Sequence, residues 1–259
     1  MLKLFDTHAH YNDEAFNEDR EEIIKKVYES GVEKTVVVGY DLEHSKMAVE
    51  IAKSHDFLYA AVGIHPSDIA PNKNEINKQV KEIEKIAQNE KVVAIGEIGL
   101  DYHWETDTKD LQKYAFLEFI KLANKLNLPI IIHSRDAIMD TIEVIKGDIL
   151  PNKKGILHCC QLNKDLVKAG LEAGFYISFA GAITFKNSKN APEIIQMVPD
   201  DRLLVETDSP YLSPEPYRGQ RNDSSNVKFV AEKVAEIKGK SLEEIAKITY
   251  ENARRIYNI

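Results

Sequence analysis

The sequence predicts an α/β fold, a (β/α)8 TIM barrel formed by residues 1–259 as a single domain. Eight short apolar, β-branched runs recur along the chain, at residues 2–5, 35–38, 57–62, 92–95, 129–132, 155–157, 175–178 and 203–205. Longer polar segments with apolar residues at helical spacing separate them. This alternation indicates parallel βαβ units, and eight of them in 259 residues favour a barrel. A doubly wound open sheet is the alternative.

The segments between the runs carry helical apolar patterns. Clear examples are Ile23, Ile24 and Val27; Ile83, Ile86 and Ala87; and Phe116, Phe119, Ile120 and Ala123. After the last run, DSPYLSPEPYRGQRND is rich in Pro and Gly and predicts a loop over the barrel mouth. Two more helices are expected, the second beginning with a capping box of Ser241 and Glu244 and carrying Ile245, Ile248 and Ile256 on its apolar side. No internal repeat or interdomain linker interrupts the pattern.

Composition and charge limit the possible partners. With 43% hydrophobic and 29% charged residues, the chain has the composition of a soluble, foldable protein. The first residues lack the basic region, apolar core and small-residue cleavage site of a signal peptide, and no apolar run reaches membrane-spanning length. The adjacent Cys159 and Cys160 cannot form an ordinary disulfide. We therefore expect a cytoplasmic protein with no membrane and no obligate protein partner. The net charge of −8 argues against wrapping long nucleic acid but leaves a strand end, a nucleotide or a small anion open.

Polar residues follow the apolar runs at positions that converge on one mouth of a barrel. His8 and His10 follow the first run and, being two apart on an extended chain, face the same side. The other candidates are His65 after the third run, Glu97 after the fourth, His133 after the fifth, His158 after the sixth and Asp208 after the eighth. By contrast, His44, His55 and His103 follow no strand, and we expect His44 and His55 at the surface.

These residue types suit divalent metals. Imidazoles and carboxylates together bind Zn or Mn, and carboxylate oxygens also accept Mg. Two ions fit if one carboxylate bridges them, and Glu97, between Gly96 and Gly99, is the candidate bridge. Each histidine alone is more often a hydrogen-bonded core residue, and each carboxylate alone a helix cap or an ion-pair partner. Five histidines at the ends of strands argue against coincidence.

Divalent ions favour hydrolysis, because they lower the pKa of bound water and polarise a carbonyl or phosphoryl oxygen. We expect Asp208 to act as the general base for the metal-activated water and also as a ligand, with Thr207 and Ser209 orienting it. An amidohydrolase-like enzyme that cleaves a C–N or ester bond, such as an aminoacyl-tRNA deacylase, is the alternative. No lysine follows a strand where a carboxylated bridging lysine would be expected, which favours the phosphodiesterase. A metal-storage barrel fits poorly, since open carboxylates suit turnover.

Long ordered motifs cover nearly the whole chain: FDTHAHYND, VGIHPSD, AIGEIGLDYHW, PIIIHSRDA, ILHC, GFYISFAGAITFKN, LLVETDSPYLSPEPYRGQRND and ITYENARRIY. They resemble the TatD-type metal-dependent hydrolases. The resemblance implies a TIM barrel of the metallo-hydrolase superfamily and a deoxyribonuclease working from 3′ ends, a 3′–5′ exonuclease. The implied ligands are His8, His10, Glu97, His133, His158 and Asp208, with His65 on the substrate phosphate. Similar proteins usually continue the sixth-strand histidine as Cys-Phe-Ser-Gly, whereas this chain reads Cys159-Cys160-Gln161-Leu162, which predicts altered preference or rate.

A nuclease also needs phosphate contacts. Arg135 after the fifth run, and Arg218 and Arg221 in the loop after the eighth, are the candidates, because arginine binds phosphate in a bidentate manner. Alternatively, Arg218 and Arg221 form ion pairs with carboxylates and hold the loop in place. Lys186 could add a charge. Tyr102, His103 and Trp104 either stack on a terminal base or form an apolar lid. The expected substrate is a DNA end, with RNA as an alternative.

Overall fold

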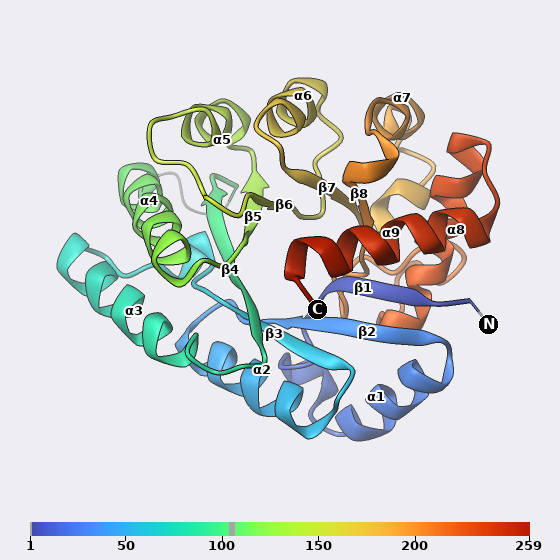
Figure 1. Cartoon of the computed structure of the whole chain (residues 1–259), viewed down its shortest axis with the longest axis horizontal. Coiled ribbons are helices and arrows are strands. Elements are labelled where there is room, and N and C mark those ends of the chain that lie inside the picture. Colours follow the sequence, from blue (N-terminus) through green and yellow to red (C-terminus); the bar gives the residue numbers. More distant parts are fainter. Residues whose placement is uncertain (1, 104–106) are drawn as a thin grey trace.

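The computed structural model describes residues 2–103 and 107–259, and these form a TIM barrel, as the sequence predicts (Figure 1). Eight parallel strands follow one another around the sheet in the order of the sequence. They are β1 (Leu4–Ala9), β2 (Val32–Val38), β3 (Leu58–Val62), β4 (Val92–Asp101), β5 (Ile130–Arg135), β6 (Gly155–Leu157), β7 (Tyr176–Phe179) and β8 (Leu203–Val205).

The barrel closes where β1 meets the segment after β8. Ala9 and Ser209 form a parallel bridge, and the N–H of His10 donates to the carbonyl of Ser209 at 2.7 Å. On the same seam, the N–H of Asp208 donates to the carbonyl of His8 at 2.9 Å. The closure therefore brings the first and last predicted ligands together through backbone hydrogen bonds.

Helices connect the strands and surround the barrel (Figure 1). In the described residues the α-helices are α1 (Arg20–Glu29), α2 (Leu42–Ser54), α3 (Lys73–Ile86), α4 (Lys109–Leu126), α5 (Ile138–Ile145), α6 (Lys164–Glu172), α7 (Ala191–Met197), α8 (Val227–Lys238) and α9 (Leu242–Tyr257). The short 3-10 helices are η1 (Glu14–Phe16), η2 (Pro66–Asp68), η3 (Gly181–Thr184), η4 (Asp200–Arg202) and η5 (Ser224–Asn226). The predicted capping box of Ser241 and Glu244 starts α9. None of the helices in residues 2–103 and 107–259 combines the length and apolar character needed to cross a membrane.

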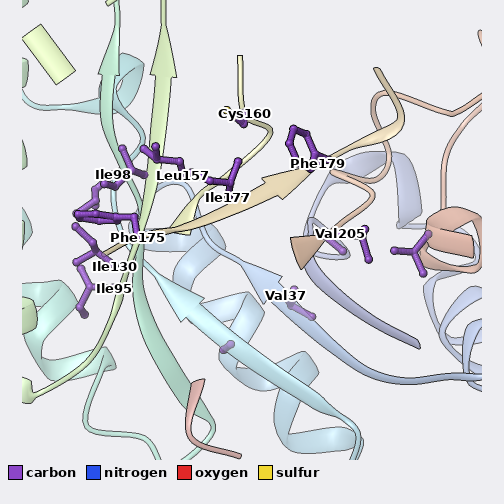
Figure 2. Packing of buried hydrophobic residues seen from close by; sticks show 14 of the residues in the cluster. Val37, Ile95, Ile98, Ile130, Leu157, Cys160, Phe175, Ile177, Phe179 and Val205 are labelled. Carbon is purple, nitrogen blue, oxygen red and sulfur yellow. The ribbon is translucent and has the colours of Figure 1, made fainter. Parts of the chain in front are cut away.

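Successive side chains of each strand point to opposite faces, so the barrel has two apolar layers. The outer layer packs under the helices; Ile95, Ile130, Leu157 and Ile177 line neighbouring strands within it (Figure 2). Fully buried groups of this kind each contribute about 1.5–3 kcal/mol to folding.

The inner layer packs against α9. Phe5, near the start of β1, stacks on Tyr257 with ring centroids 5.9 Å apart. The hydroxyl of Tyr257 donates to the carbonyl of Thr7 at 3.0 Å. Helix α9 therefore covers the end of the barrel where the strands begin and leaves the opposite end open.

Three strands continue past the end of their apolar runs and include predicted site residues. β1, β4 and β5 continue through His8, Glu97 and His133, residues expected just after the strands. The physical reason is that the polar side chains at this end contact one another inside the barrel. The backbone pairing can therefore continue past the last apolar residue. The predicted start of each strand is correct to within three residues.

Candidate metal centre

The two histidines of the first strand lie side by side. The Nε2 atoms of His8 and His10 are 3.1 Å apart, and both rings are buried. Asp208 Oδ1 lies 3.7 Å from the Nε2 atom of His8 and 3.3 Å from that of His10. Asp208 reaches this position with a φ of 57°, in the left-handed region that non-glycine residues seldom adopt.

The carboxylate of Glu97 lies between two pairs of imidazoles. Its Oε1 atom is 2.7 Å from His133 Nδ1 and 2.8 Å from His158 Nε2. Its Oε2 atom is 3.6 Å from His8 Nε2 and 3.9 Å from His10 Nε2. Each oxygen therefore faces its own pair of ring nitrogens.

Glycines next to Glu97 let β4 approach β5 this closely. Gly99 has a φ of 139°, and a Cβ atom there would overlap the carbonyl oxygen of His133. A Cβ atom on Gly96 would lie 2.6 Å from the Cβ atom of Ile131. Any larger residue at these positions would push β4 away and separate Glu97 from the histidines.

Three of the imidazoles have a hydrogen-bond partner on the ring nitrogen that faces away from the centre. His10 Nδ1 donates to the carbonyl of Val38 at 2.9 Å. His133 Nε2 lies 2.9 Å from Asp101 Oδ2, and His158 Nδ1 lies 3.2 Å from Glu206 Oε1. Such outer partners orient metal-binding histidines.

Asp101 and Glu206 are functional candidates that sequence reasoning missed. Both are buried, and both lie in the same motifs as predicted ligands. Glu206 stands two residues before Asp208, and Asp101 four residues after Glu97, so even spacing along an extended chain was the available signal.

The central carboxylates are ionised. Burial opposes ionisation of Glu97, but the charge of His158 and the hydrogen bond from His133 hold its pKa well below the usual 4.5. Burial likewise opposes ionisation of Asp208, and the hydrogen bond from His10 holds its pKa below 3.8. The ionised form of both carboxylates is the form that a metal ion binds.

The donor set fits divalent metal ions. The ligating atoms of His8, His10 and Glu97 lie within 4.8 Å of one another, as do those of His65, Glu97 and His133. Imidazole nitrogens and carboxylate oxygens are the donors that Zn and Mn prefer, and Mg accepts the oxygens. His158 Nε2 lies 2.8 Å from Glu97 Oε1, and Asp208 Oδ1 lies 3.3 Å from His10 Nε2. The residues that could hold metal here are His8, His10, Glu97, His133, His158 and Asp208.

The centre lies in a pocket of about 1020 Å³. His65 and Arg135, both predicted to bind substrate, line it together with the candidate ligands His10, Glu97, His133, His158 and Asp208. Tyr40, Leu162, Ile183, Tyr211 and Leu212 add an apolar and aromatic wall. Gln161 and Leu162, where this chain departs from the Cys-Phe-Ser-Gly pattern, are thus part of the pocket.

The structure does not bring the two loop arginines into this pocket. Arg221 pairs with Asp19 at 2.5 Å and donates to the carbonyl of Ala15 at 2.6 Å. Arg218 lies over the ring of Phe185, with 4.3 Å between its guanidinium carbon and the ring centroid. Their contact with substrate stays a prediction, and Arg221 holds the loop in the way the alternative describes.

The remaining candidates that the structure describes do not line the pocket. Tyr102 donates to Asp140 at 2.7 Å, and His103 Nδ1 lies 2.9 Å from Asp136 Oδ2. Trp104 lies outside the described residues, and Lys186 is exposed. His44 and His55 are half-buried rather than fully at the surface, because each faces a carboxylate, Asp41 and Glu21 respectively.

Comparison with known proteins identifies the family. The family model described as TatD related DNase matches residues 5–258. The chain belongs to the TatD family. Among its relatives, the uncharacterized metal-dependent hydrolase YabD of Bacillus subtilis is 46% identical over 99% of both chains. The uncharacterized metal-dependent hydrolase YcfH of Escherichia coli K12 is 35% identical, over 99% of this chain and 96% of its own.

Solved structures agree with the TatD assignment. The crystal structure of the TatD homologue YjjV from Escherichia coli K12 has a TM-score of 0.91 at 26% identity, over 100% of this chain and 99% of its own. An organophosphorus hydrolase from Deinococcus radiodurans has a TM-score of 0.69 at 12% identity, over 99% of this chain and 93% of its own, and supports the fold alone. The chain is therefore a metal-dependent hydrolase of the TatD family.

Proposed function

We propose that the protein hydrolyses phosphodiester bonds at 3′ ends of DNA, as a 3′–5′ exodeoxyribonuclease with two divalent ions, Mg, Mn or Zn. One observation carries the proposal: each carboxylate oxygen of Glu97 faces a different histidine pair. A carboxylate with this surrounding can bridge two ions. When bound, such ions lower the pKa of water and polarise a phosphoryl oxygen.

Asp208 has the role of general base. Its carboxylate lines the pocket beside His10 and is ionised at neutral pH, which is the form that accepts a proton from the attacking water. The side chain is also 15% exposed, whereas that of Glu97 is only 5% exposed, so substrate and water reach Asp208 more easily.

His65 and Arg135 hold the phosphate. Burial and neighbouring His133 lower the pKa of His65 to about 4, so its ring is neutral. Its Nδ1 atom accepts the N–H of Ser67 at 3.1 Å, which leaves the proton on Nε2 for a phosphate oxygen. Arg135 adds the guanidinium at the end of β5.

The charges of the pocket suit one phosphate at a strand end. Arg135 is its one basic side chain among the described lining residues other than histidine, against the carboxylates of Asp68, Glu97, Asp101 and Asp208. A long backbone would find too few cations here, as the net charge of −8 also argues. The wall formed by Leu162, Ile183 and Leu212 is available to the terminal base and sugar.

The ester- or amide-cleaving alternative differs in its bridging group. Amidohydrolase-like sites with a carboxylated lysine need that lysine at the metals, and no lysine is found among the described lining residues. Glu97 is available for the bridge instead. The experiment therefore includes aminoacyl-tRNA as a second substrate.

Elemental analysis of the purified protein, followed by chelation and metal add-back, tests the proposal. We expect about two divalent ions per chain, loss of cleavage of 3′-ended single-stranded DNA on chelation, and recovery on add-back. Asp208→Asn should remain unable to cleave after add-back. Metal-dependent release of amino acid from aminoacyl-tRNA, without cleavage of DNA, would replace the proposal with the alternative.

A further inference from the structure

His133 and His158 contact the same oxygen of Glu97 through different ring nitrogens. His133 uses Nδ1, at 2.7 Å, and His158 uses Nε2, at 2.8 Å. The outer nitrogens are reversed as well, since His133 turns Nε2 to Asp101 and His158 turns Nδ1 to Glu206. The two rings therefore need opposite neutral tautomers to present a lone pair toward the centre.

The tautomer decides whether an imidazole can bind a metal ion. A neutral ring carries one proton, and the nitrogen that carries it has no lone pair for a metal. A carboxylate accepts hydrogen bonds, so with a metal ion on one ring nitrogen a carboxylate that faces the other nitrogen would hold the proton there. Asp101 Oδ2 lies 2.9 Å from His133 Nε2, so it would hold the ring proton there and leave Nδ1, which faces Glu97, for a metal ion.

Asp101 is itself held in a fixed orientation. Its backbone N–H donates to the buried side chain of Gln112 at 2.8 Å, and that side chain donates back to its carbonyl at 2.9 Å. Its Oδ1 atom accepts the N–H of His103 at 2.9 Å, which leaves Oδ2 for His133. The two oxygens thus have different partners.

We propose that Asp101 is a positioning residue that sets the tautomer of His133 and makes Nδ1 its metal-binding nitrogen. The inference rests on the metal centre proposed above. An asparagine at this position keeps its amide oxygen on the N–H of His103 and turns its NH2 group toward His133 Nε2. A donor facing Nε2 drives the proton to Nδ1 and blocks metal binding.

Glu206 offers a matched comparison because its hydrogen bonds are arranged differently. Its Oε1 atom accepts both His158 Nδ1 and the N–H of Cys159, the latter at 2.6 Å. Its Oε2 atom has no hydrogen-bond partner in the described structure. A glutamine can therefore keep both bonds with its amide oxygen and preserve the tautomer of His158.

Zinc affinity of three variants tests the inference, measured by competition with a chromogenic chelator and without nucleic acid. We expect Asp101→Asn to weaken zinc binding about 10- to 100-fold. Asp101→Ala should weaken it less, because a ring without a directing partner can adopt either tautomer, and Glu206→Gln should also weaken it less. Asp101→Asn binding zinc as well as Asp101→Ala, or better, overturns the proposal, since a purely structural role favours the isosteric asparagine.

If a variant fails to fold, the inference can still be tested on the unaltered protein. In the zinc-loaded protein labelled with 15N-histidine, NMR should find a protonated Nε2 and a metal-bound Nδ1 on His133. A metal-bound Nε2 on His133 overturns the inference. Both readouts are independent of substrate, so a protein that keeps this zinc behaviour but does not cleave DNA would refute the proposed nuclease and leave the role of Asp101 intact.

Discussion

Replacing Glu97 by alanine is the most direct test of the bridging geometry. The side chain is 5% exposed, and its two oxygens lie within 3.9 Å of nitrogens on four imidazoles. Glu97→Ala removes one oxygen from each histidine pair. The loss of a partner that only orients a ligand costs about 10- to 100-fold, and a direct ligand costs at least as much.

The expected loss follows from these two contacts. Removing both should lower kcat/KM for 3′-ended DNA by about 100- to 10,000-fold, equivalent to about 3–5 kcal/mol of transition-state stabilisation. The fold should persist, because the backbone of β4 keeps its pairing with β3 and β5. Circular dichroism and bound-metal content should be measured beside the kinetics.

His44→Ala is the matched control. His44 is a half-buried histidine beside the carboxylate of Asp41, and it is not among the described residues that line the pocket. It should keep nearly full activity and metal content. Equal losses in the two variants with unchanged circular dichroism, or more than a tenth of wild-type activity in Glu97→Ala, would refute the bridging geometry.

Three more predictions concern burial and charge. Burial raises the pKa of Asp6 from 3.8 to about 7, so in chelated protein the free energy of unfolding should fall by about 3 kcal/mol as pH rises from 4 to 7. Asp6→Asn should flatten this slope in urea titrations. Arg135→Ala should raise KM about tenfold, and Arg221→Ala less because Asp19 holds that guanidinium; equal effects in a steady-state assay would contradict this. Cleavage should weaken from low to moderate salt, and an insensitive rate would exclude phosphate-driven binding.

The barrel was predictable because its signal is local. Each apolar run and each helical pattern is read within a few residues, and their alternation leaves few topologies. The convergence of His8, Glu97, His133 and Asp208 followed from one rule, that strand ends meet at one mouth. The distances between their nitrogens and oxygens bear out this convergence.

What the sequence could not predict depends on contacts between distant segments. Asp101 meets His133 because the β4–β5 register places Gly99 beside His133, and no local pattern determines that register. Arg221 meets Asp19 across 202 residues. Asp208 turns back toward His8 through a left-handed φ that its neighbours in sequence do not reveal. Propensity and periodicity carry no information on such pairings.

The seam that closes the barrel also sets an order of events during protein synthesis. On either side of His8, the carbonyl of Thr7 accepts the hydroxyl of Tyr257, and the N–H of His10 donates to the carbonyl of Ser209. Thr7 and Tyr257 are separated by 250 residues. A nascent chain holding only β1 to β7 has both histidines of the first motif and their contacts with β2, but it lacks the hydrogen bonds to Asp208 and Ser209. Pairings between such distant residues form slowly. Metal capture in the final geometry therefore has to wait until the ribosome has released the segment that carries α9.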